Sequence, residues 1–236
     1  MRRRSLSMVV LVAGSLFSRS ARAQAIAGRV VEGEARAPAA QAVVILVGDS
    51  ATIAGAAQTD SAGQFALDPG RPGSYRLLFF RAGGGSVATP EFELDSTDLE
   101  RQFLIPGDGA AHPALYLAGD VDQTAHDRPV RGLIPGYPDV EAHRGIRGRV
   151  RILFVIDETG RPDKSSLQIL GATSEAFANS VRSALMRSRF MPAMLHGGVV
   201  PQLAQLTIHF RCATDPMPPD GNVVVTTLYA ECTLRR

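Results

Sequence analysis

The sequence contains no tryptophan, and only 6% of its 236 residues are aromatic. Stacking platforms for sugars or bases are therefore poorly supplied. No two of its five histidines are spaced by two to four residues, so the spacing indicates no metal site. The histidines are His112, His126, His143, His196 and His209. The glycine run at 83–85 lies between strand-like segments rather than before a helix, and we expect no phosphate-binding loop, cofactor or metal.

Catalytic motifs are also scarce. Gly48-Asp49-Ser50 resembles the start of a lipase signature, but Ala51 follows and the composition is that of a turn. Asp157, Glu158 and Asp163 surround a second turn, where we interpret them as solvated residues. The sequence therefore predicts no enzyme and no catalytic residue.

The N-terminus has the pattern of a secretory signal. Three arginines at 2–4 precede the apolar run Met8–Phe17, and Ala21-Arg22-Ala23 supplies a small-x-small exit. This run is too short to span a bilayer, which needs about 20 residues. We expect a signal peptide at 1–23, cleaved after Ala23 or Ala25, and a periplasmic protein. An uncleaved membrane anchor is the alternative.

Removal of the signal changes the charge. The whole chain has 25 basic and 23 acidic residues and a net charge of +2. Residues 1–23 hold five of the arginines and no acid, so the processed chain keeps 20 against 23, a net charge of −3. Nucleic-acid binding needs a basic surface that remains after processing. Because the processed chain is net acidic, we expect no nucleic-acid partner.

About 210 processed residues indicate two small domains. In the first, at 24–106, short apolar runs alternate with turn-forming residues, a pattern typical of an all-β sandwich. The predicted strands are 26–31, 42–47, 64–67, 75–80, 91–94 and 101–105. A linker is predicted at 107–131, with Ala114–Ala118 as one docked segment.

The second domain, at 132–212, predicts the order β-β-α-β, and the fold class is α+β. Its strands are 150–156, 166–170 and 202–210, and its helix is 174–189, capped by Ser174. In the first strand Val150, Ile152, Phe154 and Ile156 share one face. The other face is polar at its start and apolar later.

This second domain resembles the TonB C-terminal domain. The resemblance is carried by Tyr137-Pro138, Gly145 and Gly148, the turn at 157–160, the run Arg189-Phe190-Met191-Pro192-Ala193 and Gly197 before the last strand. It implies that the last strand is an open edge to which a partner peptide adds, a mode called β-augmentation. The implied partner is a protein or peptide, with an outer-membrane TonB-dependent receptor as the first candidate.

The implied partner-binding residues lie at the start of this domain and along its last strand. They are Tyr137, Pro138, Gln202, Leu203, Ala204, Gln205, Leu206, Thr207, Ile208, His209 and Phe210. Tyr137-Pro138 has a second interpretation, as a structural start of the domain.

The chain departs from a TonB-type transducer. A cleavable signal and a β domain stand where a transducer has a membrane helix and a proline-rich spanner, so the resemblance implies binding rather than energy transduction. The first domain resembles carboxypeptidase regulatory-like, transthyretin-like domains through Gly28-Arg29-Val30, Thr59–Phe65 and Pro72–Leu77. This implies a non-catalytic module. The alternative function is therefore a structural or carbohydrate-adhesive envelope protein.

The tail, 213–236, is predicted to add an extra strand at Val223–Tyr229, which would cover the edge of the last strand. Cys212 and Cys232 are expected to pair, as two cysteines of an exported chain usually do. A regular hairpin would separate them by roughly 33 Å, because each strand residue adds about 3.3 Å. Either the disulfide or the full hairpin can form, and we favour the disulfide.

Overall fold

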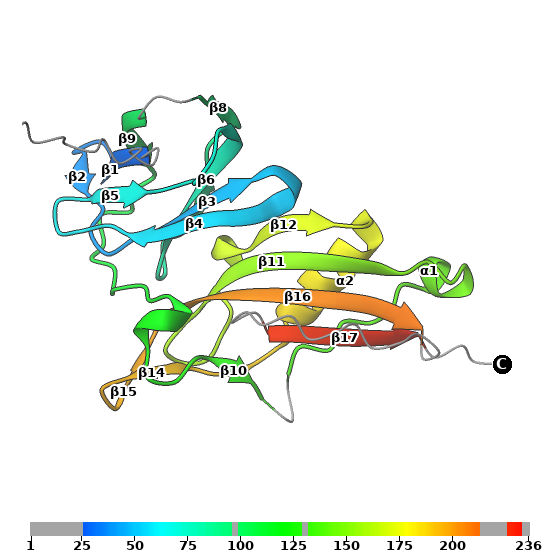
Figure 1. Cartoon of the computed structure of the whole chain (residues 1–236). Coiled ribbons are helices and arrows are strands. Elements are labelled where there is room, and N and C mark those ends of the chain that lie inside the picture. Colours follow the sequence, from blue (N-terminus) through cyan, green and yellow to red (C-terminus); the bar gives the residue numbers. More distant parts are fainter. Residues whose placement is uncertain (1–25, 96–98, 129–131, 213–225, 233–236) are drawn as a thin grey trace, which may run out of the picture.

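The computed structural model describes residues 26–95, 99–128, 132–212 and 226–232. Two lobes built on β sheets pack against each other (Figure 1): an N-terminal lobe, 26–105, and a C-terminal lobe, 132–232. The predicted signal peptide lies outside the described residues. None of the helices within the described ranges is long and apolar enough to cross a membrane.

The N-terminal lobe contains two sheets. One has β2 (Ala37–Pro38), β1 (Ile26–Glu32) and β5 (Gln64–Leu67), with β9 (Leu99–Ile105) parallel to β1. The other has β4 (Thr52–Gln58), β3 (Val43–Gly48), β6 (Gly73–Arg81) and β7 (Gly85–Ala88), with β8 (Phe92–Leu94) on β6. Side chains from both sheets, among them Val30, Leu46, Phe65 and Phe79, form one buried core.

The six strands predicted for this lobe are all present. Sequence reasoning missed β4, whose residues Thr-Ile-Ala-Gly-Ala-Ala-Gln have little strand propensity. Pairing with β3 over Val43–Gly48 holds this segment extended. The relation of the lobe to carboxypeptidase regulatory-like domains stays a prediction.

The C-terminal lobe has a four-stranded sheet in the order β12 (Gln168–Ala172), β11 (Gly148–Ile156), β16 (Gln202–Cys212) and β17 (Thr226–Cys232). Strands β11 and β16 are antiparallel, with register pairs from Gly148–Phe210 to Ile156–Gln202. Its smaller elements are α1 (Asp139–His143), β13 (Phe190–Met191), β14 (Ala193–Leu195), β15 (Gly198–Val200) and the 3₁₀ turn η3 (Lys164–Ser166). The segment between the lobes contains η2 (Ala118–Asp120) and β10 (His126–Asp127), and the N-terminal lobe contains the 3₁₀ turn η1 (Asp49–Ala51). Gly48-Asp49-Ser50 thus lies at a turn, as its composition predicts.

Helix α2 (Glu175–Leu185) covers one face of this sheet. Its N-cap is Ser174, whose hydroxyl accepts a hydrogen bond from the Phe177 N–H, as predicted. The prediction that the helix reaches Arg189 is wrong. The Arg187 N–H donates to Ala184 O and the Ser188 hydroxyl also bonds Ala184 O, so the last turn closes early and the chain leaves the helix before Pro192.

The two faces of the sheet pack against different parts of the protein. Val150, Ile152, Phe154 and Ile156 pack beneath α2. On the opposite face, Leu153 and Val155 of β11 join Leu203 of β16 and residues of β3 and β6 in a core shared by both lobes. The polar-then-apolar pattern of this face therefore has a physical cause, because the N-terminal lobe covers only its apolar half.

The predicted linker crosses this junction. Leu115 is fully buried in the shared core. Its N–H donates to Gln41 O, and its carbonyl accepts a hydrogen bond of 2.7 Å from the Gln58 side chain. Tyr116 forms an isolated parallel bridge to Gln202 at the start of β16. The segment around Leu115 is docked, as its apolar composition indicates.

The turn at 157–160 depends on Gly160. This residue has a φ of +76°, its carbonyl accepts the Phe190 N–H, and a Cβ here would overlap Phe190 O. We expect Gly160→Ala to lower the free energy of unfolding by at least about 2 kcal/mol, because a left-handed conformation and a backbone clash act together. Urea denaturation of the full chain measures this.

Gly109→Ala is the matched control. Gly109 has nearly the same φ, +72°, but nothing lies within 4 Å of its Cβ position. We expect a loss of about 1 kcal/mol there, from backbone strain alone. Equal losses at the two positions would show that the clash with Phe190 O is relieved without cost.

Candidate strand-binding site

The outer edge of β16 is occupied by the chain's own tail. Strand β17 runs parallel to β16, with register pairs from Leu206–Thr226 to Cys212–Cys232. At the other end of the edge, Tyr116 exchanges backbone hydrogen bonds with Pro201 O and the Leu203 N–H. Figure 1 shows β17 along the lower side of β16. An extra strand is therefore present on the edge that the resemblance assigns to a partner. Its described residues are Thr226–Cys232, whereas the prediction was Val223–Tyr229, of which 223–225 lie outside the described residues.

The direction of β17 excludes the regular hairpin. A hairpin would make β17 antiparallel, whereas the observed strand is parallel and places Cys232 next to Cys212 in register. Neighbouring strands lie about 4.8 Å apart, within the Cα separation of about 4.4–6.8 Å that a disulfide needs. The backbone is thus compatible with the predicted disulfide, which stays a prediction.

Most of the predicted site residues in β16 offer backbone rather than side chains. Leu206, Ile208 and Phe210 are buried beneath α2, and Leu203 is buried in the core shared by the lobes. Gln202 is 3% exposed, and its side-chain oxygen accepts a 2.6 Å hydrogen bond from the Ala125 N–H. Ala204, Gln205, Thr207 and His209 are only partly buried.

Tyr137 is held by the fold. Its ring packs edge-on against Phe177 and Phe210, with centroid distances of 5.6 Å to each. Its hydroxyl donates a 2.5 Å hydrogen bond to Ile146 O. These contacts support the structural interpretation of Tyr137-Pro138, and Pro138 directly precedes α1 as its N-cap. A role of either residue toward a partner stays a prediction.

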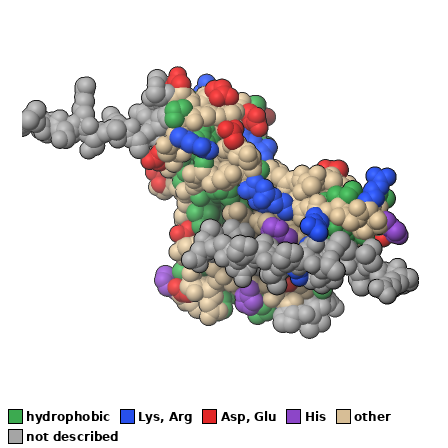
Figure 2. Space-filling view, turned by 45° about the vertical axis from the view of Figure 1, so that its right-hand side comes forward, with side chains coloured by type: hydrophobic (Ala, Val, Ile, Leu, Met, Phe, Trp, Pro, Cys, Tyr) green, Lys and Arg blue, Asp and Glu red, His purple; other side chains and the backbone are tan. Residues whose placement is uncertain are grey.

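The sheet face beyond the N-terminal lobe is basic. Arg149 and His209 are register partners, and Arg151 follows on the same face. Burial, and then the charge of Arg149, lowers the pKa of both Arg151 and His209. The Arg151 guanidinium donates to Ser50 O across the junction. Figure 2 shows Arg, Lys and His side chains gathered near the place where the lobes meet.

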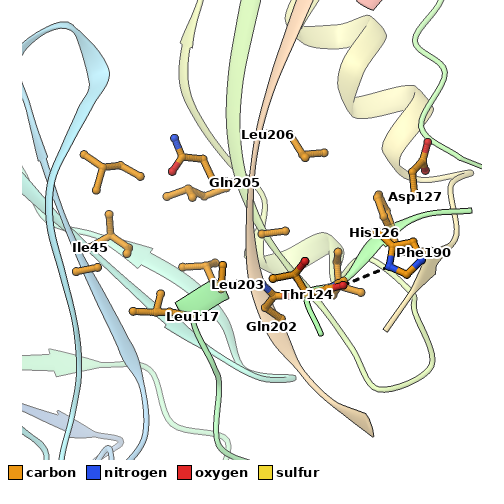
Figure 3. A pocket seen from close by; sticks show the side chains of 17 residues that line it. Ile45, Leu117, Thr124, His126, Asp127, Phe190, Gln202, Leu203, Gln205 and Leu206 are labelled. Atoms are coloured by element: carbon orange, nitrogen blue, oxygen red, sulfur yellow. Dashed lines mark hydrogen bonds between the residues drawn. The ribbon is translucent and has the colours of Figure 1, made fainter. Parts of the chain in front are cut away.

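A cavity of about 310 Å³ opens at the junction, next to residues 202–206 of β16. Ile45 and Ile53 of the N-terminal lobe line one side, and Leu206 and Phe190 line the other. In Figure 3, Leu203 and Gln205 lie on the Ile45 side of β16 and Leu206 on the other side. Sequence reasoning missed this cavity, because its walls come from both lobes and the linker.

Among the described residues, no group of three His, Cys, Asp or Glu side chains is placed to hold a metal ion. His126, which lines the cavity, belongs to β10, and His209 belongs to β16.

The sequence model of the family described as Gram-negative bacterial TonB protein C-terminal matches residues 134–212. Protein TonB of Pseudomonas aeruginosa is 34% identical over 104 residues, which are 44% of this chain and 30% of that protein. Both matches support a TonB C-terminal domain at residues 134–212. This chain spans about a third of the length of the curated relative it matches.

Two solved structures are also similar. The solution structure of the Pseudomonas aeruginosa TonB C-terminal domain is 30% identical, covers 43% of this chain and 97% of that chain, and has a TM-score of 0.34. Klebsiella pneumoniae 5-hydroxyisourate hydrolase is 16% identical, covers 39% of this chain and 97% of that chain, and has a TM-score of 0.31. At these TM-scores neither likeness assigns an activity to this chain.

Proposed function

We propose that this chain binds a strand of a partner protein in the periplasm, by β-augmentation at the outer edge of β16. The observation that supports this most directly is β17, the chain's own strand, which pairs in parallel with this edge over Leu206–Cys212. Backbone hydrogen bonds supply affinity in such a complex, and alternate side chains supply specificity. The first candidate partner is an outer-membrane TonB-dependent receptor, as the TonB C-terminal domain suggests.

In this proposal the partner strand replaces β17. Both strands would use the same edge groups of β16, so they compete. The apparent affinity for the partner is then the intrinsic affinity multiplied by the fraction of molecules in which the edge is uncovered. The register also suggests a chemical preference. Glu231 of β17 is the register partner of Arg211 of β16, so we expect an acidic residue at this position, near the C-terminal end of the partner strand.

The aromatic residues of the N-terminal lobe give little support to a carbohydrate-adhesive function. Tyr75, Phe79 and Phe80 are at most 4% exposed, and Phe65 is 6% exposed. Phe65, Phe79 and Phe103 pack against one another, with centroid distances of 5.2–6.3 Å. These rings form core rather than a surface on which a sugar could stack.

A full-length variant with the tail strand broken tests the proposal. In Thr227→Pro/Leu228→Pro, two neighbouring residues of β17 lose their N–H groups. Adjacent N–H groups of a strand point to opposite sides, so one of the two faces β16 in wild type. We expect a fluorescent peptide with the sequence of residues 226–231 to bind this variant at least about tenfold more tightly than wild type, by fluorescence anisotropy.

Thr227→Ser/Leu228→Val is the control, because it changes the same positions and keeps every backbone N–H. Its affinity for the peptide should stay near that of wild type. If the proline variant binds the peptide no better than wild type while its circular dichroism is unchanged, the edge of β16 is not a strand receptor.

A further inference from the structure

The cavity at the lobe junction continues the line of the β16 edge. Strand β17 begins opposite Leu206, and Leu206 itself lines the cavity. The next residues along the edge, Gln205 and Ala204, line it too. Because the Leu203 N–H faces this edge, the backbone groups of Gln205, two residues on, face it as well. A parallel strand on β16 that extends beyond Leu206 therefore enters the cavity.

Both faces of this slot are apolar. Toward the N-terminal lobe it is bounded by Ile45, Ile53 and Leu117, and toward α2 by Ile156 and Phe190. An edge strand commonly has one covered face and one wet face, and its sequence alternates accordingly. A strand that enters this slot is covered on both faces, so consecutive residues of it meet apolar walls on opposite sides.

Three of the polar side chains that line the cavity are already engaged. The Gln202 side-chain oxygen accepts the Ala125 N–H, and His126 Nδ1 is 3.2 Å from Thr124 O. An Asp127 oxygen accepts a 2.8 Å hydrogen bond from the Leu133 N–H. These contacts leave the apolar walls as the main feature that a ligand can use.

The slot is short. Tyr116 already pairs with the edge at Pro201 and Leu203, so an added strand can extend from Leu206 by only about two residues. The cavity volume of about 310 Å³ lies at the lower end of the ~300–1,000 Å³ found for ligand pockets. Its size and shape fit a few apolar side chains.

We infer that this cavity binds two consecutive apolar side chains of the partner strand, located directly before the residues that pair with Leu206–Cys212. The inference rests on the proposed function, because it concerns the same edge. It defines the class of ligand: a peptide with an adjacent apolar pair followed by a strand-forming segment. The N-terminal lobe then contributes to specificity, since Ile45 and Ile53 form one wall.

Two synthetic peptides test this. Both contain the sequence of residues 226–231, preceded by Val-Val in one and by Ser-Ser in the other. They are titrated against the full-length Thr227→Pro/Leu228→Pro protein. We expect the Val-Val peptide to bind at least about tenfold more tightly, because only its side chains gain from burial in the cavity.

Filling the cavity should remove this preference. Ala56 of β4 is exposed and lines the cavity, so Ala56→Trp adds a large ring there without changing a core residue. When Ala56→Trp is added to the Thr227→Pro/Leu228→Pro protein, we expect the Val-Val peptide to bind as weakly as the Ser-Ser peptide. Ala66→Trp, at an exposed position of β5 outside the cavity lining, is the matched control and should keep the preference.

The outcomes separate the two proposals. Equal affinities of both peptides, unchanged by Ala56→Trp, would overturn the inference and leave strand binding at β16 intact. Binding of neither peptide would overturn the proposed function itself. Binding of laurate that is abolished by Ala56→Trp, together with equal affinities of the two peptides, would assign the cavity to an acyl chain instead.

Discussion

Reduction should raise the affinity of the protein for a strand-forming peptide by about a hundredfold. Cys212 and Cys232 are register partners in neighbouring parallel strands. A disulfide between them closes a loop of about 20 residues, which by loop entropy favours the closed tail by about 3 kcal/mol. A competing peptide has to overcome this free energy, and 3 kcal/mol corresponds to roughly a hundredfold in its dissociation constant.

Fluorescence anisotropy with the peptide of residues 226–231, before and after treatment with a reductant, measures this effect. Cys232→Ser is the control, because it removes the disulfide and should bind tightly under both conditions. Thiol labelling of the native protein checks the premise. Alkylation of both cysteines without reduction would contradict it, and peptide affinity should then not depend on the reductant.

This prediction joins two features that the sequence indicates separately. Strand propensity at Val223–Tyr229 predicts an extra strand, but propensity does not determine its direction. A disulfide and a regular hairpin exclude each other on distance, and the observed parallel pairing is compatible with both the extra strand and the disulfide. The register could not be predicted, because it depends on how the tail meets the whole edge of β16 rather than on a local pattern.

The C-terminal lobe was the more predictable half. The strands of β11, β12 and β16, the N-cap Ser174 and the turn at 157–160 follow from local signals, namely alternation, capping and glycine. The end of α2 at Leu185 was missed, because hydrogen bonds to Ala184 close the helix before the proline signal at Pro192. Local patterns thus position the site, while tertiary contacts determine its boundaries.

The candidate site was predictable only in part. The resemblance indicates the edge of β16 but not that the N-terminal lobe borders it. The sequence signal for a contact with the N-terminal lobe was the pair Leu153 and Val155, which makes one half of an otherwise polar strand face apolar. Two domains with a linker were expected from the sequence, and the shared core at this face could not be recognised without the second lobe in place.

Leu153→Arg should separate the lobes. Leu153 is 2% exposed and packs in the core formed by residues of both lobes, including Ile45 and Leu203. An arginine there leaves a charge without a partner between apolar surfaces, so we expect the free energy of unfolding to fall by about 4 kcal/mol. Small-angle X-ray scattering should show a larger radius of gyration wherever the protein remains folded.

Ala66→Arg is the matched control, since Ala66 of β5 is exposed and stands outside the shared core. It should change stability by less than about 0.5 kcal/mol, as surface substitutions usually do. Equal stability of the two variants would mean that the lobes contribute no common core. If the lobes do separate in Leu153→Arg, the cavity loses its Ile45 wall, and the preference for an apolar pair should disappear with it.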